Sequence, residues 1–304
     1  MTRKQMIVEL NHYHKQRGSL GKSYAFTNDE EVKREYEEIF SHINSNDEPA
    51  MIDILTEVVV IISSSEFSPS IVFRGAFVLV HLLKLYNIPY NRFTEDIDTD
   101  WGSNFEWENF YKKLPKLLTE NSSLGMLYQY DDSNKEYSSD KMKLILKASR
   151  GSFDIVFSID VSKRISTTIM ELNISGVPVV VGDIYFNICD KLNVFATYRV
   201  GARIKDFYDL YLYSQFDGLE MDIIHSYWVI LGYALPEEIF GLSPNNFARM
   251  KKPFDLHKRL RFEDISFEDV MARVLTFTSD IYESLLLRGK LGLIWDSIRG
   301  CWFE

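Results

Sequence analysis

Three aspartates stand at alternate positions in the stretch "RFTEDIDTDW", residues 92–101: Asp96, Asp98 and Asp100. Alternate residues of a β-strand point to the same face, so a strand here would place Asp96 and Asp98 together, about 7 Å apart along the chain. Two divalent ions in a phosphoryl-transfer site lie about 3.5–4 Å apart, and one carboxylate can bridge them. Asp100 ranks lower because Trp101 and Gly102 end the predicted strand. The alternative is a polar surface loop, where charge costs little.

A third carboxylate is expected from a neighbouring strand. The stretch "FDIVFSIDVS", residues 153–162, carries Asp154 and Asp160 on one face. An aspartate inside an apolar strand is unfavourable unless it is paired or binds a metal. Ile159 and Val161 flank Asp160, whereas Asp154 lies beside a predicted turn, so we expect Asp160 to be the third metal ligand. The alternative is that both aspartates are solvated on an exposed face.

A glycine precedes these strands. In "FRGAFVLV", Gly75 separates a β-branched stretch from a predicted helix. Backbone N–H groups at a helix N-terminus can bind phosphate. A lone glycine more often marks a tight turn, and only its position before the Asp-x-Asp strand favours a phosphate site.

The pattern predicts an α+β fold with a small mixed sheet, followed by an all-α part. Expected domains are residues 1–182 and 183–304. Expected helices cover 28–43, 48–65, 75–87, 104–121 and most of the chain from Asp183 onward, and expected strands cover 70–74, 91–101, 142–149, 153–162 and 177–181.

Composition limits the class of function. The 304 residues are 46% hydrophobic and carry a formal net charge of -10, which disfavours a general nucleic-acid coat because such binding needs a positive field. Cys189 and Cys301 match no zinc spacing, and a reducing cytoplasm fits them best. No apolar run reaches the length of about 18 residues that a membrane span needs, so we expect a soluble, cytoplasmic protein without a membrane segment.

Three motifs in order resemble the AbiEii/AbiGii nucleotidyltransferase toxins of the DNA polymerase β-like superfamily. "FRGAFVLVHLLKLYNIPYNRFTEDID" is similar to the family's glycine-containing helix start and its R-[ST]-x-D-x-D strand, although Phe93 separates Arg92 from Thr94 here. "DIYFNICDKLNVFATYR" resembles the helix with a central lysine, and "RIKDFYDLYLY" resembles the R-x-K-D-x-x-D-L segment.

The later motifs also have their own physical reading. Lys191 borders an apolar stripe on the predicted helix, formed by Ile184, Ile188, Leu192 and Phe195. A lysine in that position needs an anion, and a nucleoside triphosphate is a natural candidate. The alternative is a lysine whose ammonium reaches past the stripe into water. Asp206 and Asp209 share a helical face. One interpretation is that they stabilise the N-terminal turn of the helix by interacting with the helix dipole. The other, which the resemblance indicates for Asp206, is that the carboxylate orients Lys191 or Arg203 toward a nucleotide.

The resemblance implies a metal-dependent nucleotidyltransferase that moves NMP from an NTP to an acceptor hydroxyl, with the active site in the cleft between its two domains. Asp96, Asp98 and Asp160 would bind two Mg²⁺ ions, and Lys191 would offset the developing charge. The acceptor would be RNA, above all tRNA, or a protein, and the chain would be the toxin of a toxin–antitoxin or abortive-infection system with a cognate antitoxin. Expected nucleotide-binding residues are Arg74, Gly75, Ala76, Thr94, Lys191, Arg199, Arg203, Asp206 and Asp209.

One departure supports a rival hypothesis. The family commonly has serine or glycine after the motif glycine, and Ala76 stands here. A catalytically inactive nucleotide- or RNA-binding scaffold is therefore the alternative.

His12 and His14 do not share a helical face and are expected at the surface. The basic stretch 251–264 is either a tRNA-facing patch or a solvated face, and 284–303 is expected to pack in the core or to form a partner surface.

Overall fold

The computed structural model describes residues 50–90, 92, 94–102, 105–131, 136–137, 141–151, 153–163, 169–197, 204–235, 249–255, 265–287, 289 and 291–304. The expected helix at 28–43, His12 and His14 lie outside this range. The described residues form two compact units. The first unit falls within Met1–Phe73, Phe93–Ile165 and Glu171–Val180, and the second within Arg74–Arg92, Ser166–Met170 and Val181–Glu304. A domain boundary at residues 182 and 183 stays a prediction.

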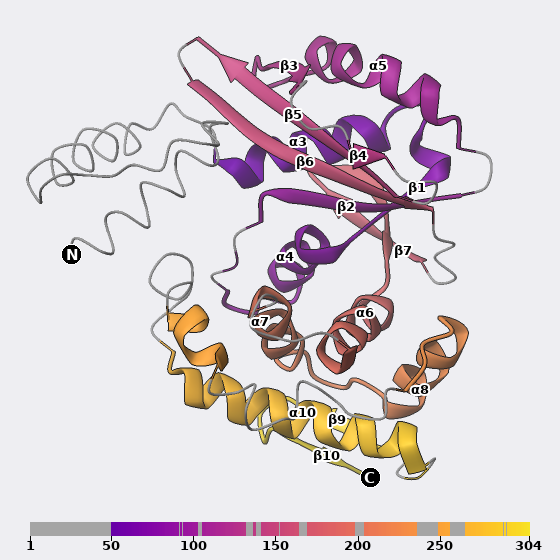
Figure 1. Ribbon diagram of the computed structural model, residues 1–304, viewed down its shortest axis with the longest axis vertical. Coiled ribbons are helices and arrows are strands. Elements are labelled where there is room, and N and C mark those ends of the chain that lie inside the picture. The colour runs from indigo at the N-terminus through magenta and orange to yellow at the C-terminus, as the bar shows by residue number, and fades with distance from the viewer. Residues whose placement is uncertain are drawn as a thin grey trace, which may run out of the picture. The chain divides into compact units, whose positions relative to one another are not determined.

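An eight-stranded mixed sheet, most of which belongs to the first unit, contains the predicted strands (Figure 1). Its strands are β1 Ile71–Arg74, β2 Asp96–Trp101, β3 Leu127–Tyr130, β4 Glu136–Tyr137, β5 Lys141–Arg150, β6 Phe153–Lys163, β7 Ile169–Ile174 and β8 Val177–Gly182. The order is β3-β5-β6-β2-β1-β8-β7, and β4 also pairs with β5. β2 runs parallel to β6, whereas β5 pairs with β6 antiparallel. The sheet is thus mixed, as predicted, but β3, β4 and β7 were not expected.

The two faces of the sheet differ in polarity because side chains alternate along each strand. On β6, Phe153, Ile155, Phe157, Ile159 and Val161 are buried. This apolar face packs with the helices α3 Met51–Ser63 and α5 Trp107–Glu120. Tyr128 of β3 donates a hydrogen bond to Glu57 of α3 (2.6 Å), and the ring of Trp101 of β2 lies 6.2 Å from that of Trp107 of α5. The intervening aspartates of β2 and β6 therefore belong to the opposite face, the polar face of the sheet.

A buried glutamate ties α3 to the segment before β3. The Glu57 carboxylate accepts hydrogen bonds from Ser122 Oγ (2.8 Å), Ser123 Oγ (2.9 Å), the Leu124 N–H (2.8 Å) and Tyr128 Oη (2.6 Å). Burial raises the pKa of Glu57, but these four donors outweigh it and lower the pKa below its ordinary value of 4.5.

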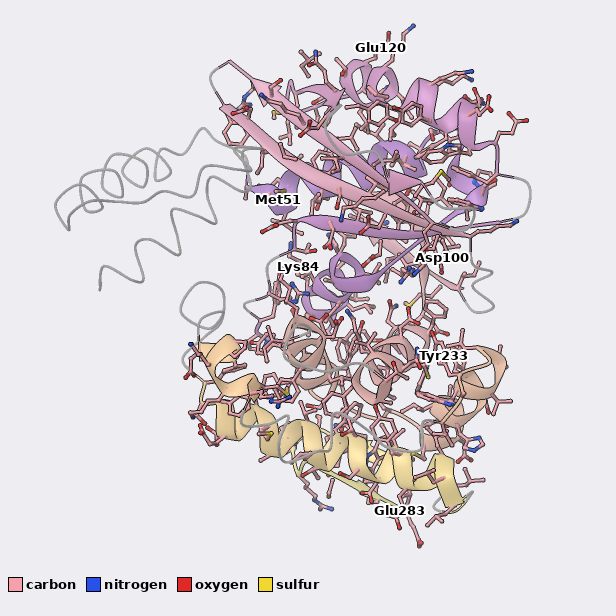
Figure 2. The ribbon with its side chains drawn as sticks, viewed as in Figure 1. Met51, Lys84, Asp100, Glu120, Tyr233 and Glu283 are labelled. Atoms are coloured by element: carbon pink, nitrogen blue, oxygen red, sulfur yellow. The ribbon has the colours of Figure 1, made fainter. Side chains whose placement is uncertain are left out.

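The second unit is mainly helical. Its helices are α4 Gly75–Leu85, α6 Ile184–Thr197, α7 Ile204–Tyr213, α8 Met221–Ile230 and α10 Phe267–Leu287. Tyr282 of α10 is buried and donates a hydrogen bond to the Leu192 carbonyl of α6 (2.6 Å), while its neighbour Glu283 points outward (Figure 2). None of the helices in the described part of the chain is long and apolar enough to cross a membrane.

The C-terminal end of the second unit differs from the all-α expectation. The hairpin of β9 Ile294–Asp296 and β10 Cys301–Phe303 follows α10. Trp295 and Trp302 place their rings 4.9 Å and 5.8 Å from Phe277 of α10. Trp295 and Trp302 therefore pack in the core, which agrees with one of the two expectations for 284–303. Leu286, Leu287, Leu291 and Ile298 are exposed, and the end of the segment forms a hairpin in place of a helix.

Replacing Glu57 by Gln should lower the free energy of unfolding by about 2 kcal/mol at pH 7, because the amide turns donor hydrogens toward donor groups. Since the folded pKa is depressed, the carboxylate stabilises the fold above pH 4.5, and this contribution is lost as the pH falls from there through the folded pKa. Urea unfolding followed by circular dichroism at pH 7 and pH 3 measures both effects.

The matched control is Glu66→Gln. Glu66 is largely exposed, and its ion-pair partner in the described part of the chain is the exposed Lys113 (2.7 Å). Its loss should therefore change the free energy of unfolding by less than about 0.5 kcal/mol. A Glu57→Gln deficit that is the same at both pH values would contradict the role given to the carboxylate.

Candidate active site

Two of the predicted metal ligands lie side by side on the polar face of the sheet. In the parallel pairing of β2 with β6, Asp98 is the partner of Asp160, and Asp96 is the partner of Ser158. On the other side of β6, Lys143 of β5 is the antiparallel partner of Asp160. Its Nζ atom lies 3.6 Å from Asp160 Oδ1. Asp98, Asp160 and Lys143 thus form one row across three adjacent strands.

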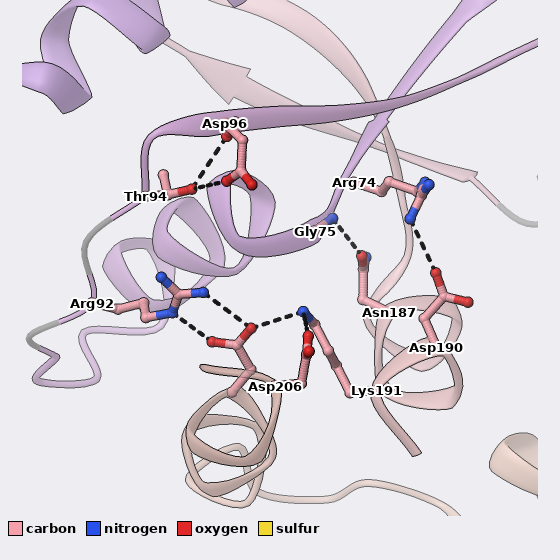
Figure 3. Close-up of polar contacts among 10 residues, drawn as sticks. Arg74, Gly75, Arg92, Thr94, Asp96, Asn187, Asp190, Lys191 and Asp206 are labelled. Carbon is pink, nitrogen blue, oxygen red and sulfur yellow. Dashed lines mark hydrogen bonds and ion pairs between the residues drawn. The ribbon is translucent and has the colours of Figure 1, made fainter. Parts of the chain in front are cut away.

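The third predicted ligand, Asp96, is held by the residue two positions before it. The Thr94 hydroxyl donates a hydrogen bond to Asp96 Oδ1 at 2.7 Å (Figure 3). Thr94 itself is buried. Thr94 was expected to bind nucleotide, and in this structure its hydroxyl positions the carboxylate of Asp96.

The donor set fits magnesium that arrives with a phosphate ligand. Carboxylate oxygens are hard ligands, and Mg²⁺ in nucleotide enzymes is commonly bound by one or two carboxylates together with phosphates and water. Among the described residues no group of three or more His, Cys, Asp or Glu side chains is close enough to hold an ion without further ligands. Of the other aspartates on this face, Asp154 lies near the start of β6 and pairs with Lys147, and Asp100 is buried.

A second cluster, within the second unit, surrounds Lys191 (Figure 3). Its Nζ atom lies 2.6 Å from Asp206 Oδ1 and 2.8 Å from Asp209 Oδ2. Asp209 also accepts hydrogen bonds from Arg92, at 2.6 Å from Nε and 3.3 Å from Nη2. The structure therefore brings together Lys191, Asp206 and Asp209 of the predicted set and adds Arg92. The one sequence signal for Arg92 is its place in the R-[ST]-x-D-x-D pattern.

Burial makes this cluster electrostatically strong. Burial raises the pKa of Asp209, but Arg92 and Lys191 outweigh it and lower that pKa to about 2. Burial likewise lowers the pKa of Lys191, and the two aspartates raise it above its ordinary value. Lys191 is therefore a permanently protonated group, held by carboxylates and not by apolar contacts alone.

The start of α4 is fixed by an asparagine that the sequence analysis missed. Gly75 has a φ of 73°, a left-handed conformation that favours glycine. Its N–H donates to Asn187 Oδ1 at 3.0 Å, and Asn187 Nδ2 donates to the carbonyls of Gly182 and Asp183, each at 2.8 Å. The N–H that was expected to contact phosphate thus has a protein acceptor, and the Ala76 side chain beside it is buried.

The remaining predicted residues are more dispersed. Arg74 donates to Asp190 at 3.2 Å, and Asp190 also accepts a hydrogen bond from Tyr233. Arg199 and Arg203 lie outside the described residues. Of the basic stretch 251–264 only 251–255 is described, and there Lys251 pairs with Glu268.

One comparison with known proteins identifies a family. The chain matches the family model "Nucleotidyl transferase AbiEii toxin, Type IV TA system" over residues 58–273. A search of curated proteins finds no match. Among solved structures, JHP933 from Helicobacter pylori is 14% identical, with a TM-score of 0.48 over 78% of this chain and 92% of that one. An antigenic nucleotidyltransferase-like protein from Paracoccidioides brasiliensis is 16% identical, with a TM-score of 0.37 over 79% and 94%.

Replacing Asp209 by Asn should lower the free energy of unfolding by about 3 kcal/mol at pH 7, because Arg92 and Lys191 lose a buried counter-charge. The depressed pKa adds a pH dependence: Asp209 stabilises the fold above its ordinary value of 3.8 and loses this effect as the pH falls toward 2. Urea unfolding of both proteins at pH 7 and pH 2.5 measures the difference. A deficit at pH 7 below about 0.5 kcal/mol would contradict a buried pair.

Tyr213, one turn after Asp209, offers the opposite test. Its buried hydroxyl has no hydrogen-bond partner in the described part of the chain, and burial raises its pKa. Tyr213→Phe should leave the thermal midpoint unchanged or raise it, because no hydrogen bond is lost and an unsatisfied group is removed. The matched control Tyr282→Phe removes the bond to the Leu192 carbonyl and should lower the midpoint. Equal losses in both variants would contradict the assignment.

Proposed function

The chain belongs to the AbiEii nucleotidyl transferase toxin family of type IV toxin–antitoxin systems, and on this premise we propose that it transfers NMP from an NTP to an acceptor hydroxyl with the help of Mg²⁺. The observation that carries the proposal is the register of β2 against β6, which pairs Asp98 with Asp160 on the polar face of the sheet. Hydrogen bonding from Thr94 to Asp96 adds a third oriented carboxylate.

Each residue of the proposed site has a defined task. Bound Mg²⁺ would neutralise phosphate charge and make the acceptor hydroxyl more acidic. Asp96, Asp98 and Asp160 are the proposed ligands, and a carboxylate oxygen of Asp160 also takes the proton of the acceptor hydroxyl. The acceptor oxygen then forms a bond to the α-phosphorus, the bond from that phosphorus to the bridging oxygen breaks, and pyrophosphate leaves with the electron pair. Lys191 keeps the role of phosphate contact that its family motif implies.

The finer parts of the proposal rest on the family. We take RNA, above all tRNA, as the acceptor and a cognate antitoxin as the protein partner, and we place the reaction in the cytoplasm. The second candidate function is an inactive nucleotide- or RNA-binding scaffold. Ala76 and the hydrogen bond from Gly75 to Asn187 favour this rival, because together they leave fewer donors for phosphate at the start of α4.

The proposal predicts that label from one α-³²P-labelled NTP moves into total tRNA in the presence of Mg²⁺. Asp98→Asn and Asp160→Asn should each reduce the rate by about 10²–10³, the cost of losing one group that stabilises transition-state charge. Asp154→Asn, on the same face of β6 but paired with Lys147, is the matched control and should retain transfer.

Two outcomes would contradict the proposed nucleotidyltransferase activity. One is transfer that persists in Asp98→Asn and Asp160→Asn. The other is NTP binding that stabilises the fold equally with and without Mg²⁺, with no label moved to tRNA or protein, which is the behaviour of the scaffold.

A further inference from the structure

A row of lysines runs beside the carboxylates on the polar face of the sheet. Lys143 is the register partner of Asp160, and Lys147 is the register partner of Val156. Directly paired residues of adjacent strands point to the same face, so both lysines share the face of Asp98 and Asp160. The alternate residues Met142, Leu144, Leu146 and Ala148 of β5 are buried on the other face.

Both lysines form ion pairs with aspartates of β6. Lys143 lies 3.6 Å from Asp160, and Lys147 contacts Asp154. The side chains of the two lysines are 41% and 44% exposed, and exposed pairs of this kind contribute only about 0–1 kcal/mol. A divalent ion bound to Asp160 would therefore displace the Lys143 ammonium at little cost. The displaced ammonium then has lost a counter-ion and can take another anion.

We propose that Lys143 and Lys147 form a phosphate-binding site for an RNA acceptor, and that metal binding at Asp160 opens it. This inference rests on the metal role given to Asp160 in the proposed function. The two lysines are four residues apart, about 13 Å along an extended strand, which suits a polyanion with one charge per nucleotide better than a single phosphate group.

The charge of the whole chain favours this assignment. With a net charge of -10, the chain as a whole repels RNA, so an RNA acceptor needs local cations near the reacting carboxylates. A neutral protein segment that carries the acceptor hydroxyl would gain no binding affinity from these lysines.

The test is fluorescence anisotropy of an end-labelled single-stranded RNA oligonucleotide with and without Mg²⁺, at several salt concentrations. Wild-type protein should bind more tightly with Mg²⁺. Lys143→Gln with Lys147→Gln should lose at least about tenfold in affinity with Mg²⁺, and the slope of log K against log salt should become less steep by about 1 per lysine. Asp160→Asn should bind without Mg²⁺ as tightly as wild type binds with it, because Lys143 is then always released.

The matched control is Lys163→Gln. Lys163 is exposed at the end of β6 and pairs in register with Trp101, whose side chain lies on the apolar face, so it belongs to the opposite side of the sheet. The Lys163→Gln variant should bind RNA with the same affinity as wild type. The thermal shift caused by NTP and Mg²⁺ should be the same in the double variant as in wild type, which shows that the fold and the nucleotide site are intact.

Three results would overturn the inference: no RNA binding by wild type with Mg²⁺, equal losses in Lys163→Gln and the double variant, or a double variant that transfers label to a protein acceptor as fast as wild type. The last result leaves the proposed function standing. Conversely, a wild-type protein that transfers no label from any NTP contradicts the proposed function. The anisotropy experiment still measures how much the two lysines contribute to RNA affinity.

Discussion

The polar face of the sheet depends on the register between two parallel strands. In β2 and β6 every second side chain is buried, and all of these except Thr99 are apolar. Sliding either strand by one residue would turn its aspartates toward the apolar face and expose Ile97 or Ile159. Packing of that apolar face on α3 and α5 therefore fixes the pairing of Asp98 with Asp160. Lys143 follows from the same constraint, since its position opposite Asp160 is set by the hairpin of β5 and β6.

The second unit depends on a different interaction, a carboxylate buried between two cations. Asp209 is fully buried, and the cations of Arg92 and Lys191 stabilise its ionised form there. The three residues come from α6, α7 and the segment after α4, so the ion cluster joins elements that are distant in sequence. The same cluster gives the Lys191 ammonium two carboxylate partners, Asp206 and Asp209, which raise its pKa.

Patterns over a few neighbouring residues correctly predicted features that depend on neighbouring residues alone. The alternation in "DIDTD" and "FDIVFSIDV" identified two strands and the face their aspartates share, and Gly75 was identified as a helix start. Two contacts over longer separations were missed. Arg92 and Asp209 are 117 residues apart, and Gly75 and Asn187 are 112 apart, so tertiary packing alone brings them together. The C-terminal hairpin was missed because its apolar residues also fit a helical spacing.

The central claim is that Asp98 and Asp160 bind a divalent ion together with the nucleotide. Crystals grown with Mn²⁺ and a non-hydrolysable NTP analogue, recorded at a wavelength where manganese scatters anomalously, test it most directly. A metal ion shared by the two aspartates predicts an anomalous peak within coordination distance of both carboxylates and of the triphosphate. Bound analogue with no peak between Asp98 and Asp160, and with Lys143 still paired to Asp160, would contradict it.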